Sequence, residues 1–118
     1  MTLVEVKTAE LIGPALDLAV AQIESETEHV QFSALPSSQH YYAPSRKWAQ
    51  GGPLIEKHFI NILYQPDINC ASSAITPRWI GSVVSHSVTG PTPLIAAMRC
   101  LVASKLGDTV QVPEELLP

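Results

Sequence analysis

The side chains most able to contact a ligand gather in one stretch, YYAPSRKWAQGGP, at positions 41–53. Aromatic faces can stack on a base, and an arginine can bind a phosphate through two hydrogen bonds. An amide can recognise a polar edge, and successive glycines let the backbone approach a ligand closely. These residue types predict a ligand-binding site formed by Tyr41, Tyr42, Arg46, Trp48, Gln50, Gly51 and Gly52.

The same stretch also has a purely structural interpretation. Tyr42 and Trp48 are large enough to anchor a core or an interface, and Gly51-Gly52 can serve only to turn the chain. Arg99 is a further candidate, because it carries the only charge between Thr92 and Lys105. If partly buried it can bind an anion; otherwise it lies exposed on a helix or pairs with a carboxylate. The sequence leaves these alternatives open.

Catalytic and metal-binding patterns are absent from the sequence. The four histidines are scattered without zinc-site spacing, and the serines form no G-x-S-x-G motif. Gly51-Gly52-Pro53 matches neither a P-loop nor a dinucleotide-binding turn. No acidic pair is placed for acid–base work, and the glutamates from Glu24 onward are expected on a solvated face. We therefore expect a binding protein that is not an enzyme and uses no metal or cofactor.

Composition limits the partners and the location. Charged residues make up 15% of the chain, below the ~25% typical of soluble domains, which favours a partly covered surface and hence a homo-oligomer. The formal charge of −4 does not fit a protein that binds duplex nucleic acid. No apolar run approaches the ~18 residues of a membrane helix, and the first ten residues lack signal-peptide features. We expect a cytoplasmic protein without membrane contact, whose Cys70 and Cys100 are free thiols.

The elements that must position these side chains are predicted from periodicity and caps. The clearest is the terminal helix, with Thr92 as N-cap, Pro93 in the first turn and Gly107 at its end. Gly51-Gly52-Pro53 is expected to break any helix begun near Arg46. The fold class is α+β, a small antiparallel sheet packed by three helices. The sheet combines the hairpin Phe59–Tyr64/Arg78–Ser85 with an N-terminal strand near Leu3–Val6, and the helices are Gly13–Ile23, Pro53–His58 and Thr92–Leu106.

The remaining segments are predicted to be irregular. Positions 1–118 are expected to form a single domain, in which residues 25–52 are an irregular candidate for function, since long irregular segments are usually functional or disordered. Within it only His29–Phe32 has the composition of a strand. Gln65–Pro77 is expected to be a loop, and Ser87–Pro91 a connection into the terminal helix.

Several motifs carry a family resemblance. YAPSRKWAQGGPLIEK, a later strand with Trp79, GPTPLIAAMRCLVASKLGD and VPEELL resemble the NinX-like phage and prophage proteins, a family of unknown function. VKTAELIGPALDLAVA resembles the family's opening, whereas residues 25–39 and 67–77 do not match. The layout is also similar to the phage α-β-α sandwich domain. The resemblance implies a phage origin and a fold, without assigning a reaction.

Two functions follow as expectations. In the first, a small phage accessory protein binds an anionic, nucleotide-type ligand of host anti-phage defence through Tyr42, Arg46, Trp48 and Arg99, and sequesters it without catalysis. In the second, the protein is an adaptor or inhibitor of a host or phage enzyme. Exposed apolar residues such as Leu18 and Trp48 would then form the interface.

Overall fold

The computed structural model describes residues 2–26, 30–69 and 74–118 of the chain. These residues form an α+β fold, which confirms the predicted class. The helices are α1 (Gly13–Glu24), α2 (Trp48–Lys57) and α3 (Pro93–Leu106), with the 3-10 helices η1 (Thr8–Glu10) and η2 (Glu114–Leu116). The strands are β1 (Leu3–Lys7), β2 (Asn61–Tyr64), β3 (Asp67–Asn69), β4 (Ala74–Thr76), β5 (Trp79–Ser82), β6 (Ser87–Gly90) and β7 (Thr109–Pro113).

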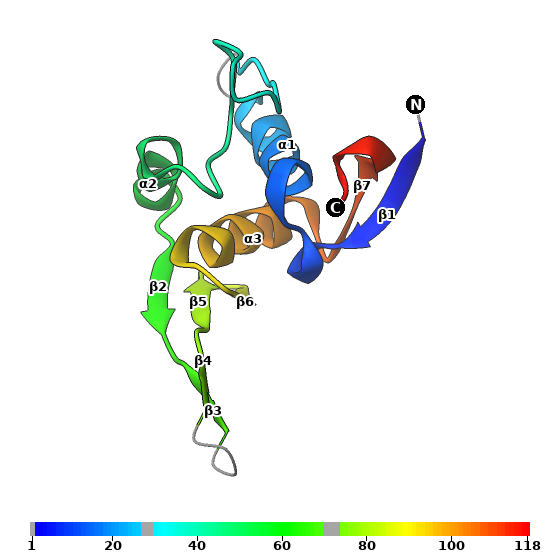
Figure 1. The fold of residues 1–118 in the computed structure, drawn as a ribbon. Helices are drawn as coiled ribbons and strands as arrows, with labels where there is room; N and C mark the ends of the chain where they lie inside the picture. The colour runs from blue at the N-terminus through cyan, green and yellow to red at the C-terminus, as the bar shows by residue number, and fades with distance from the viewer. Residues whose placement is uncertain (1, 27–29, 70–73) are drawn as a thin grey trace.

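Helix α3 is the element on which the others pack (Figure 1). It contacts α1 and α2 and also the strands β2, β5 and β6. Every residue from Leu94 to Ala103 except Arg99 is buried. The predicted ends are confirmed: the Thr92 hydroxyl accepts from the Ile95 N–H at 3.1 Å, and Gly107 ends the helix with a φ of 96°. Local signals therefore predict this helix almost to the residue.

The three-stranded sheet lies directly on α3 because two of its residues have no side chain. A Cβ on Gly81 would lie 2.5 Å from the carbonyl oxygen of Ala96, and a Cβ on Gly90 would lie 2.7 Å from the Ala96 nitrogen. Ala96 and Ala97 are themselves fully buried at this contact. Small residues on both sides thus bring helix and sheet backbones together.

The strands form separate sheets, which corrects the predicted N-terminal arrangement. The hairpin is confirmed, because β2 pairs antiparallel with β5. On its other side β5 pairs with β6, a segment predicted to be a connection. Strand β1 instead pairs with β7. The register explains this choice, since Val4 lies opposite Val112 and Val6 opposite Val110, so the valines of both strands share one face.

The predicted loop Gln65–Pro77 contains a continuation of the hairpin. Strands β3 and β4 pair in the same register as β2 and β5, and the Gln65 N–H donates to the Arg78 carbonyl at 3.0 Å between them. We call residues 65–69 and 74–78 the arm, which extends away from the helices (Figure 1). Cys70 lies outside the described residues.

The predicted break at Gly51-Gly52-Pro53 is wrong, because α2 runs continuously through all three residues. A proline there removes one helical N–H, whose acceptor would be the Ala49 carbonyl, and packing compensates for that loss. Gly51 is buried against Pro44 and Leu94, so that a Cβ would lie 2.2 Å from the Pro44 carbonyl oxygen. The first glycine is therefore needed for close packing rather than for a turn.

The end of α2 explains why the next strand starts later than predicted. The Ile60 N–H donates to the Ile55 carbonyl at 3.0 Å and the Phe59 N–H to the Glu56 carbonyl at 3.3 Å, as in a Schellman motif. Phe59 occupies the position with positive φ, at 55°, and its side chain is exposed. The capping motif thus uses Phe59 and Ile60, and β2 begins at Asn61.

The irregular segment ends at Lys47, because Trp48 begins α2. The predicted strand His29–Phe32 is wrong for residues 30–32, which form none, while His29 lies outside the described residues. An isolated bridge joins Ser33 to Tyr41 and closes this segment into a loop. No helix among the described residues is long and apolar enough to cross a membrane.

Candidate functional site

Gln50 fixes the tyrosine segment to α2. Its Oε1 accepts from the Ala43 N–H at 2.5 Å, and its Nε2 donates to the Tyr41 carbonyl at 2.9 Å. Both ends of the amide are therefore engaged within the protein. The side chain predicted to recognise a ligand edge instead holds residues 41–43 against the first turn of the helix.

The two tyrosines occupy different environments. Tyr42 is half-buried and packs against the hydrophobic core. The Tyr41 ring lies 5.7 Å from the Arg46 guanidinium carbon and 5.0 Å from the Lys47 Nζ, so both cations approach it closely enough for cation–π attraction. Tyr42 thus matches the structural interpretation, and Tyr41 joins a cationic cluster at the surface.

Arg46 is bound to a buried carboxylate on α1. Its Nη2 lies 3.0 Å from Oδ2 of Asp17, whose Oδ1 accepts from the Ser45 N–H at 2.9 Å. Asp17 is fully buried, and it is a functional candidate that the sequence analysis missed. The available signal was an aspartate between Leu16 and Leu18 in an otherwise apolar helix, because a buried acid requires partners.

A second buried carboxylate lies two turns further along the same face of α1. Glu24 is 4% exposed and binds the Lys57 Nζ and the His58 Nε2, each at 2.9 Å. The predicted solvated face is therefore wrong for Glu24. Asp17 and Glu24 together hold both ends of the segment 45–58 on α1.

Despite burial, the contacts with Lys57 and His58 lower the pKa of Glu24. Burial raises the pKa of the carboxyl, but hydrogen bonds from Lys57 and His58 and their positive charges outweigh burial and hold the pKa below its usual value. A lowered pKa in the folded state stabilises the protein above the unfolded value of about 4.3. That stabilisation is lost as the pH falls through the folded pKa.

Acid titration tests this coupling. We expect the free energy of unfolding to fall as the pH drops below about 4.3, the unfolded value, and Glu24→Gln to lower it by about 1–2 kcal/mol at pH 7. The difference between wild type and variant should shrink as the pH falls further, as measured by urea unfolding with circular dichroism. A difference that stays constant with pH would contradict the role of the Glu24 charge.

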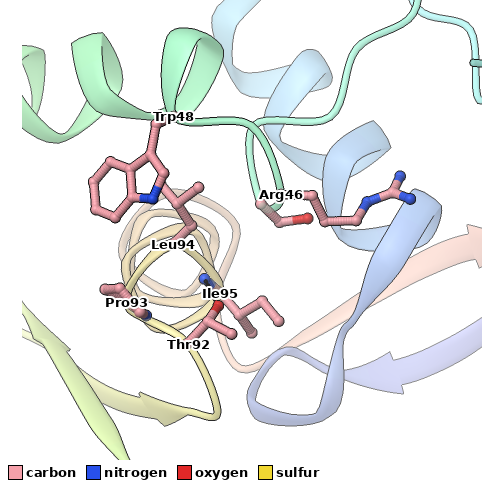
Figure 2. A pocket seen from close by; sticks show the side chains of 7 residues that line it. Arg46, Trp48, Thr92, Pro93, Leu94 and Ile95 are labelled. Carbon is pink, nitrogen blue, oxygen red and sulfur yellow. Dashed lines mark hydrogen bonds between the residues drawn. The ribbon is translucent and has the colours of Figure 1, made fainter.

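A pocket lies between the start of α2 and the amino terminus of α3 (Figure 2). Its volume is about 260 Å³, and it is lined by Ser45, Arg46, Trp48, Thr92, Pro93, Leu94 and Ile95. Trp48 is 56% exposed, so it is not a core residue. Figure 2 shows its indole beside the first turn of α3, while the Arg46 side chain extends the other way, toward α1. The structure does not bring these two side chains together as a clamp.

One polar group in the pocket wall is unsatisfied. Ser45 is 2% exposed, and its hydroxyl has no hydrogen-bond partner among the described residues. Such buried groups are normally paired, so an orphan hydroxyl in a pocket wall indicates a missing partner. The amino terminus of α3, where the helix dipole attracts negative charge, forms the opposite wall.

The two glycines of α2 have unequal roles. Gly51 is fixed by contact with Pro44 and Leu94, whereas the nearest atom to a Cβ on Gly52 would be the Trp48 ring, at 3.9 Å. Gly52 therefore leaves space beside the exposed indole. Of the predicted pair, only Gly52 offers its backbone next to a candidate ligand-stacking ring.

Arg99 lies away from this pocket. Its Nε donates to the Leu11 carbonyl at 2.7 Å and its Nη1 to the Thr89 carbonyl at 3.0 Å, so it joins the segment after η1 to β6. Burial lowers the pKa of Arg99, and the charge of Glu10 opposes that change. No carboxylate within the described ranges forms an ion pair with Arg99, and its hydrogen bonds to two carbonyls assign it a structural position.

The arrangement favours binding of an anionic group next to a ring. A helix amino terminus and a hydroxyl can hold the anion, and an exposed indole can stack on the ring. The pocket lining contains no acidic side chain. Within residues 2–26, 30–69 and 74–118 no three His, Cys, Asp or Glu side chains are grouped as a metal site would require.

Comparison with known proteins places the chain in a family. No curated protein matches it. The family model described as Bacteriophage P22, NinX matches residues 7–105, which span every candidate residue named above. This match confirms the resemblance found in the sequence motifs. The chain therefore belongs to the NinX family of phage proteins.

Proposed function

We propose that this phage accessory protein binds a small anionic ligand of the nucleotide type in the pocket beside Trp48, and that it sequesters the ligand without converting it. A nucleotide signal of host anti-phage defence is the biological source that a phage origin favours. The observation that carries the proposal is the exposed Trp48 indole next to the amino terminus of α3.

The aromatic part of the ligand would stack on Trp48. An indole with 56% of its surface exposed is costly to leave in water, and stacking of a base on an aromatic side chain contributes about 1–3 kcal/mol. Gly52 adds no side chain that would cover the ring. The base would therefore lie against Trp48, with its polar edges toward solvent.

The anionic part of the ligand would lie at the start of α3. Pro93 has no N–H, and the Ile95 N–H is taken by the Thr92 hydroxyl, so the first-turn donor left for a ligand is the Leu94 N–H. The Ser45 hydroxyl on the opposite wall, which has no partner among the described residues, would be the second donor. A volume of about 260 Å³ holds one phosphate and part of a ring, and the rest of the nucleotide would extend over the surface.

Calorimetry with the full chain tests the proposal. The probes are cyclic nucleotides and ADP-ribose-type nucleotides, with inorganic phosphate as the minimal anion. We expect saturating heat at one nucleotide per chain for at least one member of the panel. A folded protein that gives no heat with any of them would overturn the nucleotide proposal.

Replacement of Trp48 by alanine should separate binding from folding. We expect a loss of affinity of roughly 10- to 100-fold, which corresponds to one stacked base, and a change in the free energy of unfolding within about 0.5 kcal/mol because the ring is exposed. Trp48→Phe is the matched control and should retain most of the affinity. A destabilisation of about 3 kcal/mol would instead make Trp48 a packing residue.

The alternative function, as an adaptor or inhibitor of another enzyme, stays a prediction. Exposed apolar side chains such as Phe59, Leu63 and Ile75 favour contact with another protein surface. None of them lines the Trp48 pocket. Contact through these residues and nucleotide binding are therefore separable by mutation.

A further inference from the structure

We propose that one face of the arm is a self-association surface, on which the same face of a second copy of this chain packs. The proposal goes beyond ligand binding and does not depend on the Trp48 pocket. It rests on the register, exposure and charge of the arm and of the strand ends that carry it.

The register gathers the apolar residues of the arm on one face. Tyr64 lies opposite Trp79 and Ile68 opposite Ile75, and cross-strand neighbours share a face of the ribbon. We call these four residues, with the intervening Pro66 and Pro77, the apolar strip. The opposite face of the same ribbon carries Gln65, Asp67, Thr76 and Arg78.

The strip starts at the core and continues beyond it. Gly81, on the same face, is packed against α3, and the Tyr64 and Trp79 rings lie 4.8 Å apart where the arm begins. Farther out, Ile68 is 57% and Ile75 is 62% exposed. Figure 1 shows β3 and β4 extending past α3, so none of the helices in the described part of the chain covers them. An isolated two-stranded ribbon is marginally stable in water and needs its apolar face packed.

Contact through the face is favoured over contact through the edges of the ribbon. The Gln65 N–H donates to the Arg78 carbonyl, so Gln65 and Arg78 form a hydrogen-bonded pair. In an antiparallel ribbon the next pair, Pro66 and Pro77, is then a non-hydrogen-bonded pair, where backbone N–H groups would point outward to the edges. Prolines have no such donor, so both edges are interrupted there. A partner strand therefore cannot pair continuously along the arm, but side chains of the strip remain free to pack.

Area and charge both fit a second copy as the partner. The exposed residues of the strip offer roughly 500 Å² of apolar surface, the size of the largest apolar patch on a typical monomer, which is often functional. Two strips packed together would bury about 1,000 Å² in total, the smallest area expected of a specific interface and one typical of weak association. The strip carries no charge, and Asp67 and Arg78 balance each other on the far face, so a charged partner gains nothing. A two-fold axis makes one patch serve both partners.

Sedimentation velocity of the full chain over a range of concentrations tests the proposal. The variant is Ile75→Lys and its matched control is Thr76→Lys, on the same strand but on the opposite face. Both side chains are exposed, so both variants should fold, as checked by circular dichroism. We expect a dimer for wild type and for the control, and a dimer dissociation constant raised at least about 30-fold for Ile75→Lys.

Three results would overturn the proposal. One is a wild-type chain that stays monomeric at the highest concentration, and another is an Ile75→Lys variant that dimerises as well as wild type. The third is a monomeric wild type that binds neutral phosphatidylcholine vesicles in a manner lost in Ile75→Lys, which would assign the strip to a lipid surface. Nucleotide calorimetry on Ile75→Lys should be unchanged, so failure here is distinguishable from failure of the proposed function.

Discussion

Gly51→Ala is expected to lower the free energy of unfolding by about 3 kcal/mol, whereas Gly52→Ala is expected to raise it by about 0.5–1 kcal/mol. The two residues are neighbours in α2, so helix propensity favours alanine equally at both. Only packing separates them. A Cβ on Gly51 would lie 2.2 Å from the Pro44 carbonyl oxygen and 2.7 Å from Leu94 Cδ2, while at Gly52 the nearest atom is 3.9 Å away.

Because the closest atom to Gly51 belongs to the backbone, no rotamer change relieves the clash. The segment 43–46 and α2 would have to separate, which pulls on the Gln50 and Asp17 hydrogen bonds at the same time. Urea unfolding of both variants measures the difference. Equal effects at both positions would contradict the close packing of Gly51 against Pro44 and Leu94.

This pair illustrates why the sequence predicts some elements and not others. The α3 helix is determined by local signals, a Thr-Pro start, an apolar repeat and a terminal glycine, and these are readable within one stretch. Gly51-Gly52-Pro53 has equally strong local signals, but they predict a break that does not occur. The reason is non-local, because Pro44 and Leu94 provide the contact that favours glycine at position 51.

Strand partners are also non-local information. Val4 and Val6 are recognisable as a strand, but nothing near them indicates pairing with Val110 and Val112 about a hundred residues later. The arm was missed for a different reason. Pro66 and Pro77 read as loop residues, although both occupy positions of the ribbon that do not donate to the ladder.

The candidate site was predicted in position but not in geometry. Composition identified the stretch 41–53, and the structure places Trp48 at a pocket. It does not bring Arg46, Gln50 and Arg99 to that pocket as free ligand contacts, because each donates to groups within the protein. The sequence shows which side chains can donate hydrogen bonds, but not which acceptors within the folded protein bind them.

Among these hydrogen-bond acceptors, Asp17 is the one whose replacement is expected to lower the free energy of unfolding most. Asp17→Ala should lower the free energy of unfolding by about 3 kcal/mol, because it leaves the Ser45 N–H and the Arg46 guanidinium without their shared acceptor. Asp17→Asn should cost about 1–2 kcal/mol, since an amide oxygen can still accept from the Ser45 N–H. Arg46→Gln should cost at most about 1 kcal/mol, since that side chain is 42% exposed.

The Asp17→Asn variant also decides the role of Arg46. It weakens the ion pair while leaving the segment in place, so an arginine able to reach a bound nucleotide would be released to do so and affinity would rise. We expect unchanged affinity, because the guanidinium points toward α1 rather than into the pocket (Figure 2). If Asp17→Asn binds the nucleotide more tightly, and the double variant with Arg46→Gln loses that gain, Arg46 contacts the bound nucleotide. Unchanged affinity in both variants leaves Trp48, Ser45 and the amino terminus of α3 as the groups that hold the ligand.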